Sequence, residues 1–291
     1  MKNLLIMLVM LCTCPLFAQT VNNGIKEFKD LEYAKIGDVS VKLDLYVPER
    51  GEGPFPLLVW IHGGGWVSGD KTDCPMKGLC NKDYAAASVE YRLSNVAKFP
   101  AQIEDCKAAI RWLKAHSKKY NLDPNRIGVS GGSAGGHLVN LLGTTGKIKK
   151  FDTGENLDQT SEVQAVCNYF GPTEVLTALD GFDPGTDLTK ALVGMYTSLL
   201  GGPIAEKKEL AIEASPLTYV DKNAAPFMHV HGTADLLVPV AQCEKFHDKL
   251  RQSGIESRMF LIPRGGHGGP EFFAPKMVEE LQLFFDKHLK R

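Results

Sequence analysis

Residues 127–138, IGVSGGSAGGHL, restrict the fold of this chain more than any other stretch. A short β-branched run leads into Gly131, Ser133 and Gly135 in the pattern G-x-S-x-G, and small residues that can start a helix follow. Between a strand and a helix, this pattern places the serine on a sharp, strained turn with its Oγ exposed at the C-terminal edge of a sheet. Glycine on both sides avoids the clashes of larger side chains. The stretch predicts a nucleophilic serine, and a tight turn with an exposed serine is the plainer alternative.

A second glycine-rich segment follows another predicted strand. Residues 55–61, FPLLVWI, are apolar throughout, which is typical of a strand buried on both faces of a parallel sheet. They lead directly into residues 62–66, HGGGW. A flexible turn is one interpretation, but bare glycine N–H groups beside a nucleophile can also hold a developing oxyanion, as HGGG loops do in lipases and esterases. The expected oxyanion donors are the backbone N–H groups of Gly64, Gly65 and Ala134, with Gly63 as the alternative to Gly64.

The remaining pattern predicts an α/β fold with a mostly parallel, eight-stranded sheet flanked by helices. The other predicted strands are two antiparallel ones within 26–47, then 85–91, 126–129, 163–170, 226–230 and 257–262; the predicted helices are 100–119, 239–254 and 270–289. Residues 171–214 break the alternation with several Gly and Pro residues and a helical patch at 188–200. They predict a small cap insertion above the catalytic edge, and a pair of connecting helices on the flank of the sheet is the alternative.

Two further polar residues follow predicted strands at the same sheet edge as Ser133. Asp235 lies in a loop after residues 226–230, and His267 lies between two glycine pairs after the last strand. A serine hydroxyl needs a base to take its proton, and the base needs a carboxylate to orient it. The predicted catalytic residues are therefore Ser133, Asp235 and His267, in the chain order Ser, Asp, His of α/β-hydrolases. We expect His137 to pack under the serine turn and His231 to orient the loop that carries Asp235.

These segments, with VEYRLS, ASPLTYV and HGTADLLVPV elsewhere in the chain, resemble a known family. They are similar to the secreted bacterial α/β-hydrolase esterases related to hormone-sensitive lipase, and most similar to the acetyl xylan and feruloyl esterase branch. The resemblance covers roughly residues 30–290. It implies a serine esterase without a cofactor that removes short acyl (acetyl) or feruloyl groups from carbohydrate such as xylan through an acyl-enzyme. The expected partner is thus a small ester or an acylated carbohydrate.

Other functions remain as alternatives at this stage. One is a serine peptidase of the prolyl-oligopeptidase type, although the roughly 25 residues before the first predicted strand leave no room for the additional domain that such enzymes usually carry. Another is a non-catalytic hydrolase fold used for binding, against which the complete set of catalytic residue types argues. Trp66 is a candidate substrate-pocket residue, together with Phe182 and Tyr196, and membership of the core is the alternative for all three.

Residues 1–18 read as a secretory signal peptide, so residues 19–291 are expected to form a single catalytic domain outside the cytoplasm, periplasmic or secreted. The segment 11–14, LCTC, resembles a lipoprotein signal, but threonine is a poor residue before the modified cysteine. The apolar run is too short to span a bilayer.

The composition narrows the classes of partner. A formal net charge of −1 gives no electrostatic reason for binding nucleic acid or an anionic membrane. No Cys/His spacing resembles a zinc site, so no metal is expected. Cys74 and Cys80 are close enough in sequence to form a disulfide, and free thiols are the alternative that we favour.

Overall fold

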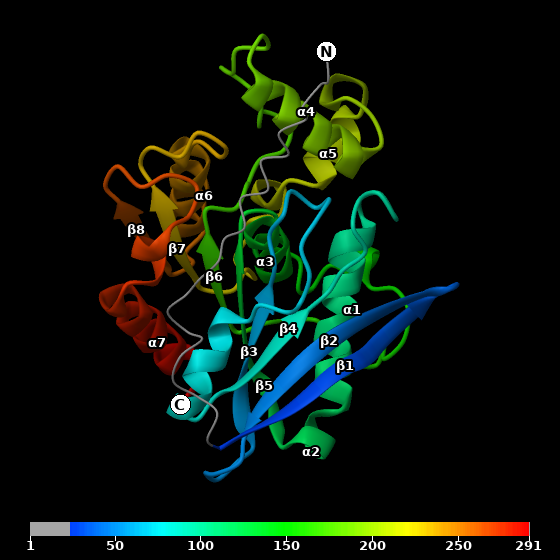
Figure 1. Ribbon diagram of the computed structural model, residues 1–291, viewed down its shortest axis with the longest axis vertical. Helices are drawn as coiled ribbons and strands as arrows, with labels where there is room; N and C mark the ends of the chain where they lie inside the picture. The colour runs from blue at the N-terminus through cyan, green and yellow to red at the C-terminus, as the bar shows by residue number, and fades with distance from the viewer. Residues whose placement is uncertain (1–23, 291) are drawn as a thin grey trace, which may run out of the picture.

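One eight-stranded sheet forms the centre of the computed structural model, which describes residues 24–290 (Figure 1). Its strands are β1 (Ile25–Ile36), β2 (Val39–Pro48), β3 (Phe55–Ile61), β4 (Ala85–Val89), β5 (Leu122–Gly132), β6 (Ala165–Tyr169), β7 (Phe227–Gly232) and β8 (Ser257–Ile262). The strand order is β1-β2-β4-β3-β5-β6-β7-β8. The β1–β2 and β2–β4 pairs are antiparallel and every other pair is parallel, which confirms the predicted fold class.

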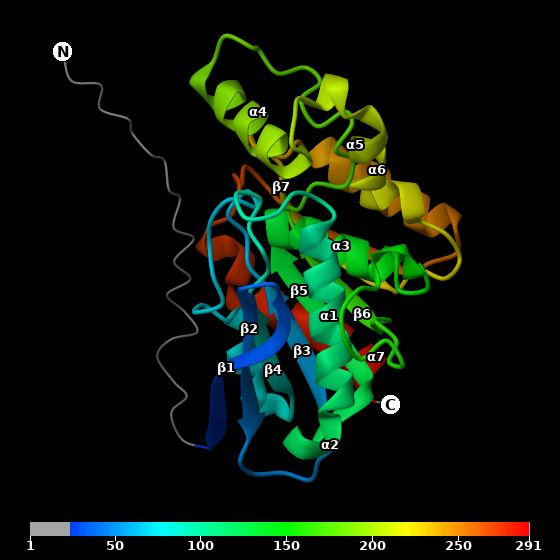
Figure 2. The same cartoon turned by 90° about the vertical axis from the view of Figure 1, so that its right-hand side faces the viewer.

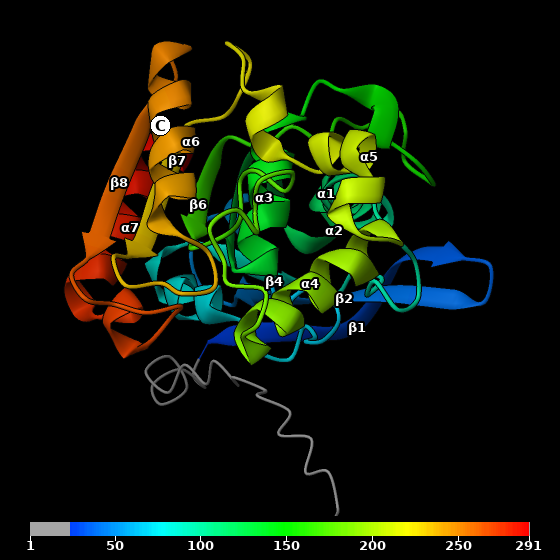
Figure 3. The same cartoon turned by 90° about the horizontal axis from the view of Figure 1, so that it is seen from above.

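Helices cover both faces of this sheet. On one face lie α1 (Ala101–Ala115), α3 (Ala134–Thr144) and α6 (Val240–Gln252), seen across the sheet in Figure 3. The other face carries the 3-10 helix η1 (Pro75–Lys82) and α7 (Pro275–Leu289). Leu57 and Val59 of β3 belong to the first core and Leu58 to the second. An uninterrupted apolar run is therefore required in this strand, because neither of its faces meets water.

The predicted helix ends are wrong in two places. The predicted helix 100–119 is α1 followed by a separate single turn, α2 (Ser117–Tyr120). The predicted helix 270–289 is the 3-10 turn η5 (Pro270–Phe273) followed by α7. Ala274, between η5 and α7, is extended with φ −57° and ψ 151°. The ring of a proline disfavours helical geometry in the residue before it, so Pro275 starts a new helix here instead of continuing the old one.

The insertion between β6 and β7 lies beyond the carboxyl ends of the central strands, as the views in Figures 1 and 2 agree. It contains α4 (Asp187–Leu200), the short turns η3 (Ile204–Glu206) and η4 (Pro216–Tyr219), and α5 (Lys208–Glu213). Helix α4 begins at Thr186, whose side chain accepts a hydrogen bond from the Thr189 N–H, and ends at Gly201 with φ 74°. The insertion thus lies at the edge where the cap is expected, and we call residues 171–214 the cap.

A charged stripe on α1 is buried rather than solvated. Lys107 and Arg111 have fully buried side chains, and both pair with Asp152, at 2.9 Å and 3.3 Å. Lys107 Nζ also donates to the carbonyls of Thr145 and Ile148. The loop after α3 is therefore attached to α1 on its inner side by ion pairs and hydrogen bonds.

Cys74 and Cys80 are buried free thiols, so the disulfide alternative is not observed. Burial raises the pKa of the Cys80 thiol to about 12, which keeps it protonated. The predicted signal peptide, residues 1–18, lies outside the described residues. Within residues 24–290, no helix combines the length and the apolar character that crossing a bilayer requires.

Candidate active site

Ser133 stands on a strained turn between β5 and α3. Its φ of 56° and ψ of −121° are unusual for a residue with a side chain. A Cβ at Gly131 would lie 2.6 Å from the carbonyl oxygen of Gly135, and a Cβ at Gly135 would overlap the Ile61 carbonyl oxygen. Strand β3 and the start of α3 therefore approach so closely that both glycines of the G-x-S-x-G pattern are sterically required.

The structure brings Ser133, His267 and Asp235 into one hydrogen-bonded line. His267 Nε2 lies 2.8 Å from Ser133 Oγ, and His267 Nδ1 lies 2.8 Å from Asp235 Oδ2. The three residues follow β5, β8 and β7, whose carboxyl ends meet at one edge of the sheet. With Nδ1–H donating to the carboxylate, Nε2 is left as the acceptor for the serine hydroxyl proton, as a general base must be.

The surroundings of Asp235 keep its carboxylate ionised. The N–H groups of Leu237 and Val238 donate to Oδ1 at 2.8 Å and 3.0 Å. His231 Nε2 lies 3.3 Å from Oδ2, which agrees with the expectation that His231 orients this loop. Burial raises the pKa of Asp235, but hydrogen bonds from His231 and His267 outweigh burial and hold the pKa well below its usual range. A fixed negative charge therefore faces His267 Nδ1 and would stabilise the imidazolium form during a reaction.

The glycine loop has its carbonyls tied back into the protein. The Gly63 carbonyl accepts a hydrogen bond from His62 Nδ1 at 2.8 Å, and the Gly64 carbonyl accepts from the N–H groups of Val67 and Ser68. In a trans peptide the next N–H points opposite to the carbonyl, so the N–H groups of Gly64 and Gly65 point away from these anchors. The His62 carbonyl likewise accepts a hydrogen bond from the Tyr91 hydroxyl at 3.2 Å, so the N–H of Gly63 stays the alternative to that of Gly64.

The other predicted donor and the loop both lie beside the nucleophile. A Cβ at Gly63 would be 3.4 Å from Ser133 Cβ. Ala134 is the first residue of α3, where a helix N–H has no acceptor within the helix. The N–H of Ser133 itself is already used, because it donates to the Tyr169 carbonyl at 2.9 Å. Gly64, Gly65 and Ala134 thus remain the candidates for binding an oxyanion.

Comparison with known protein families assigns the chain to one of them. The family model BD-FAE matches residues 43–250. This chain belongs to the BD-FAE family.

Several proteins similar to this BD-FAE chain carry names that describe them as esterases. "Probable carboxylic ester hydrolase LipM" of Mycobacterium tuberculosis is 34% identical over 76% of this chain and 53% of its own length. A solved structure described as a truncated form of a carbohydrate esterase from gut microbiota is 27% identical, with a TM-score of 0.79 over 91% of this chain and 97% of that one. A bifunctional GH43-CE protein of Bacteroides eggerthii is 32% identical, with a TM-score of 0.77 over 90% of this chain and 38% of that one. The chain spans about half the length of the curated relatives it matches.

Phe170 is a site residue that the sequence analysis missed. It follows β6, and its ring centroid lies 4.8 Å from that of His267, edge to face. A Cβ at Gly132 would lie 3.5 Å from the same ring, so Phe170 fills the space between the serine turn and the histidine. The positive φ of 41° at Phe170 directs its ring into this space. The available signal was its position directly after a buried strand at the catalytic edge.

Trp66 does not line a substrate pocket in this BD-FAE chain, which corrects the pocket prediction. Its side chain is buried, with the residue 3% exposed, and Nε1 donates to His137 Nδ1 at 3.2 Å. His137 Nε2 in turn donates to the Ala214 carbonyl at 2.6 Å, and Tyr196 packs against the indole. The indole is buried because it packs between the glycine loop, helix α3 and cap helix α4. The core alternative therefore holds for Trp66 and for Tyr196, and His137 packs as expected.

We expect the protein to lose stability as the pH falls from about 6.5 to 4. Burial lowers the pKa of His137 to about 4 and that of His229 to about 3. Over this range the two histidines become protonated in the unfolded chain but stay neutral in the folded protein. The free energy of unfolding therefore falls by about 1.4 kcal/mol per pH unit for each such histidine. Carboxylates with a lowered pKa, such as Asp235, add to the loss progressively below about pH 5. Thermal melts at 0.5-unit pH steps check this, and a melting temperature constant between pH 6.5 and 4.5 would contradict it.

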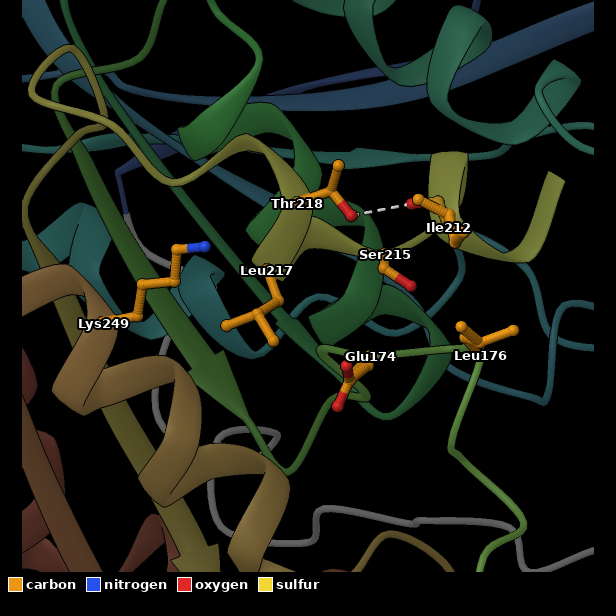
Figure 4. Close-up of a pocket in the computed structure, with 7 residues that line it drawn as sticks. All are labelled: Glu174, Leu176, Ile212, Ser215, Leu217, Thr218 and Lys249. Atoms are coloured by element: carbon orange, nitrogen blue, oxygen red, sulfur yellow. Dashed lines mark hydrogen bonds between the residues drawn. The ribbon is translucent and has the colours of Figure 1, made fainter. Parts of the chain in front are cut away.

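A hollow of about 220 Å³ lies between the cap and α6 (Figure 4). It is lined by Glu174, Leu176, Ile212, Ser215, Leu217, Thr218 and Lys249. Its polar groups are largely occupied: Glu174 pairs with Lys245 at 2.6 Å, and Ser215 Oγ donates to the Ala211 carbonyl. None of the predicted catalytic residues lines it, so this hollow is not the active site.

Proposed function

We propose that this protein is a serine carboxylic-ester hydrolase that removes short acyl groups, acetyl or feruloyl, from carbohydrate such as xylan. The observation that carries the reaction type is the continuous line from Ser133 Oγ through His267 to the ionised Asp235, with 2.8 Å at each step. The names of the relatives support ester hydrolysis, and the carbohydrate esterase among the solved structures supports an acylated sugar as the substrate.

The proposed reaction has two halves. In the first, Ser133 Oγ forms a bond to the ester carbonyl carbon while its proton passes to His267 Nε2, and the N–H groups of Gly64, Gly65 and Ala134 bind the oxyanion. The bond from carbon to the alcohol oxygen then breaks, and His267 returns the proton to the leaving alcohol. In the second half, water loses a proton to His267, attacks the acyl-serine and releases the acid with Ser133 restored.

The site suits a substrate that arrives from the surface. The His267 side chain is 12% exposed, Ser133 is half-buried and Gly64 is exposed, so the reacting atoms border solvent. Such an opening fits an acyl group on a polymer whose remaining length stays outside. Export through the signal sequence expected at residues 1–18 would bring the protein to such polymers, and we include an extracytoplasmic location in the proposal. No observation here favours the peptidase or the non-catalytic alternative.

The test is hydrolysis by the wild-type protein of p-nitrophenyl esters from acetyl to palmitoyl, followed by acetylated xylan and feruloylated oligosaccharides. We expect activity that falls steeply beyond butyryl, together with release of acetate or ferulate from the carbohydrate substrates. A preference for long chains would overturn the carbohydrate assignment in favour of a lipase. Folded protein without activity on any ester would overturn the esterase itself, and cleavage of a proline-containing peptide would then support the peptidase.

A further inference from the structure

The cap helix α4 contacts Gly65 of the glycine loop through Met195. A Cβ at Gly65 would lie 2.6 Å from Met195 Sδ and 3.1 Å from its Cγ, so the thioether packs directly on this glycine. Gly65 and Met195 are both half-buried, which places their contact at the surface of the site rather than in the core. Because Gly63 of the same loop lies against Ser133, the methionine is separated from the nucleophile only by this short loop.

The half of α4 that carries Met195 is firmly attached to the body of the protein. The ring of Tyr196 lies 5.4 Å from that of Trp66. Ser198 Oγ is hydrogen-bonded to Ser94 Oγ at 2.8 Å, and the Leu199 carbonyl accepts from the Phe99 N–H at 2.8 Å. These contacts fix the position of α4 relative to the glycine loop. Met195 is therefore a fixed part of the wall of the site and does not belong to a freely moving lid.

The order of the strands decides which part of an ester would meet this wall. His267 must protonate the leaving alcohol, so the alcohol lies on the β8 side of Ser133. Strand β3, which leads into the glycine loop, lies on the other side of β5 from β8. With the alcohol toward His267 and the oxyanion on the N–H groups of the glycine loop, the acyl group is the remaining substituent of the carbonyl carbon. It extends away from the histidine, past the glycine loop to the side of Gly65 on which Met195 lies.

We infer that Met195 is a specificity-determining residue that limits the length of the acyl group and favours acetyl over longer or aromatic acyl groups. Leu188 and Ala191 precede Met195 by seven and four residues, so they lie on the same side of α4 and continue an apolar wall outward. The inference rests on the proposed esterase function and deepens it, because it narrows the acetyl or feruloyl alternatives to a small acyl group.

Substitution of Met195 should change the acyl preference in both directions. In Met195→Ala we expect the ratio of kcat/KM for p-nitrophenyl octanoate to that for the acetate to rise about tenfold, since each methylene accommodated in a hydrophobic pocket is worth about 10-fold or more. In Met195→Trp we expect the ratio for butyrate to acetate to fall. Val193→Ala, on an exposed position of the same helix, is the matched control and should keep the wild-type ratios.

A second series separates the acyl side from the alcohol side. Acetyl esters of a small, a medium and a bulky alcohol should keep their wild-type order of kcat/KM in Met195→Ala. The inference is overturned if the wild type hydrolyses esters but Met195→Ala matches Val193→Ala in every acyl ratio, or if the alcohol preference changes instead. Absence of ester hydrolysis by the wild type is the distinct result that removes the proposed function and the inference with it.

Discussion

Ser133→Ala should lower kcat for ester hydrolysis by about 10⁶-fold, which is the scale observed when the nucleophile of a serine hydrolase is removed. Without Oγ, His267 has no hydroxyl to deprotonate, and the acyl-enzyme cannot form. The oxyanion donors stay in place, because they are backbone N–H groups, so the variant should keep a residual rate of about 10³–10⁴-fold over water. Steady-state kinetics on p-nitrophenyl acetate measure the loss, and mass spectrometry of protein treated with a phosphonate inhibitor should locate the label on Ser133.

A matched control separates chemistry from folding. Ser253 follows α6 at the amino ends of the parallel strands, the edge opposite to the catalytic one, so Ser253→Ala should retain full activity. Ser133 is strained in the folded state, and its replacement by another residue with a Cβ should leave the melting temperature close to that of the wild type. If folded Ser133→Ala keeps more than about 1% of wild-type activity, Ser133 is not the nucleophile, whatever its geometry.

Asp152→Ala, a substitution away from the catalytic residues, should produce a large loss of stability. The Asp152 side chain is 5% exposed and is the carboxylate partner of two cations, Lys107 and Arg111, whose side chains are 0% exposed. Removing one partner of a buried ion pair leaves charge without compensation and costs about 3–5 kcal/mol. For a protein of this size that corresponds to a fall in melting temperature of roughly 10 °C. Thermal and urea unfolding measure it.

The control for this substitution is Asp158→Ala in the same loop. Asp158 is exposed, so its removal should change the free energy of unfolding by less than about 0.5 kcal/mol. Lys107→Met combined with Asp152→Ala should recover part of the lost stability, because it removes one of the two uncompensated cations. Equal stability of Asp152→Ala and Asp158→Ala would show that the buried pairs contribute nothing.

The sequence was sufficient to predict the sheet because its strands have a strong local signal. Residues 55–61 and 257–262 coincide with β3 and β8. Helix ends were less predictable, since the start of α7 depends on Pro275 acting within an otherwise continuous helical pattern. The three residues of the catalytic line could be named in advance because each follows a strand at one sheet edge. Phe170 could not, because its role depends on a single positive φ that aims a common aromatic residue at His267.

The sequence by itself determined the α/β fold, the strained serine and the order Ser133, Asp235, His267, because glycine spacing and apolar runs act over a few neighbouring residues. Only the tertiary structure decided the features that join distant segments. It buried Trp66 and turned the cationic stripe of α1 inward onto Asp152. It also placed Met195 of the cap over Gly65. The physical reason is that burial of an indole, a lysine or a methionine depends on what packs against it, and those partners lie from 38 to 130 residues away in the chain.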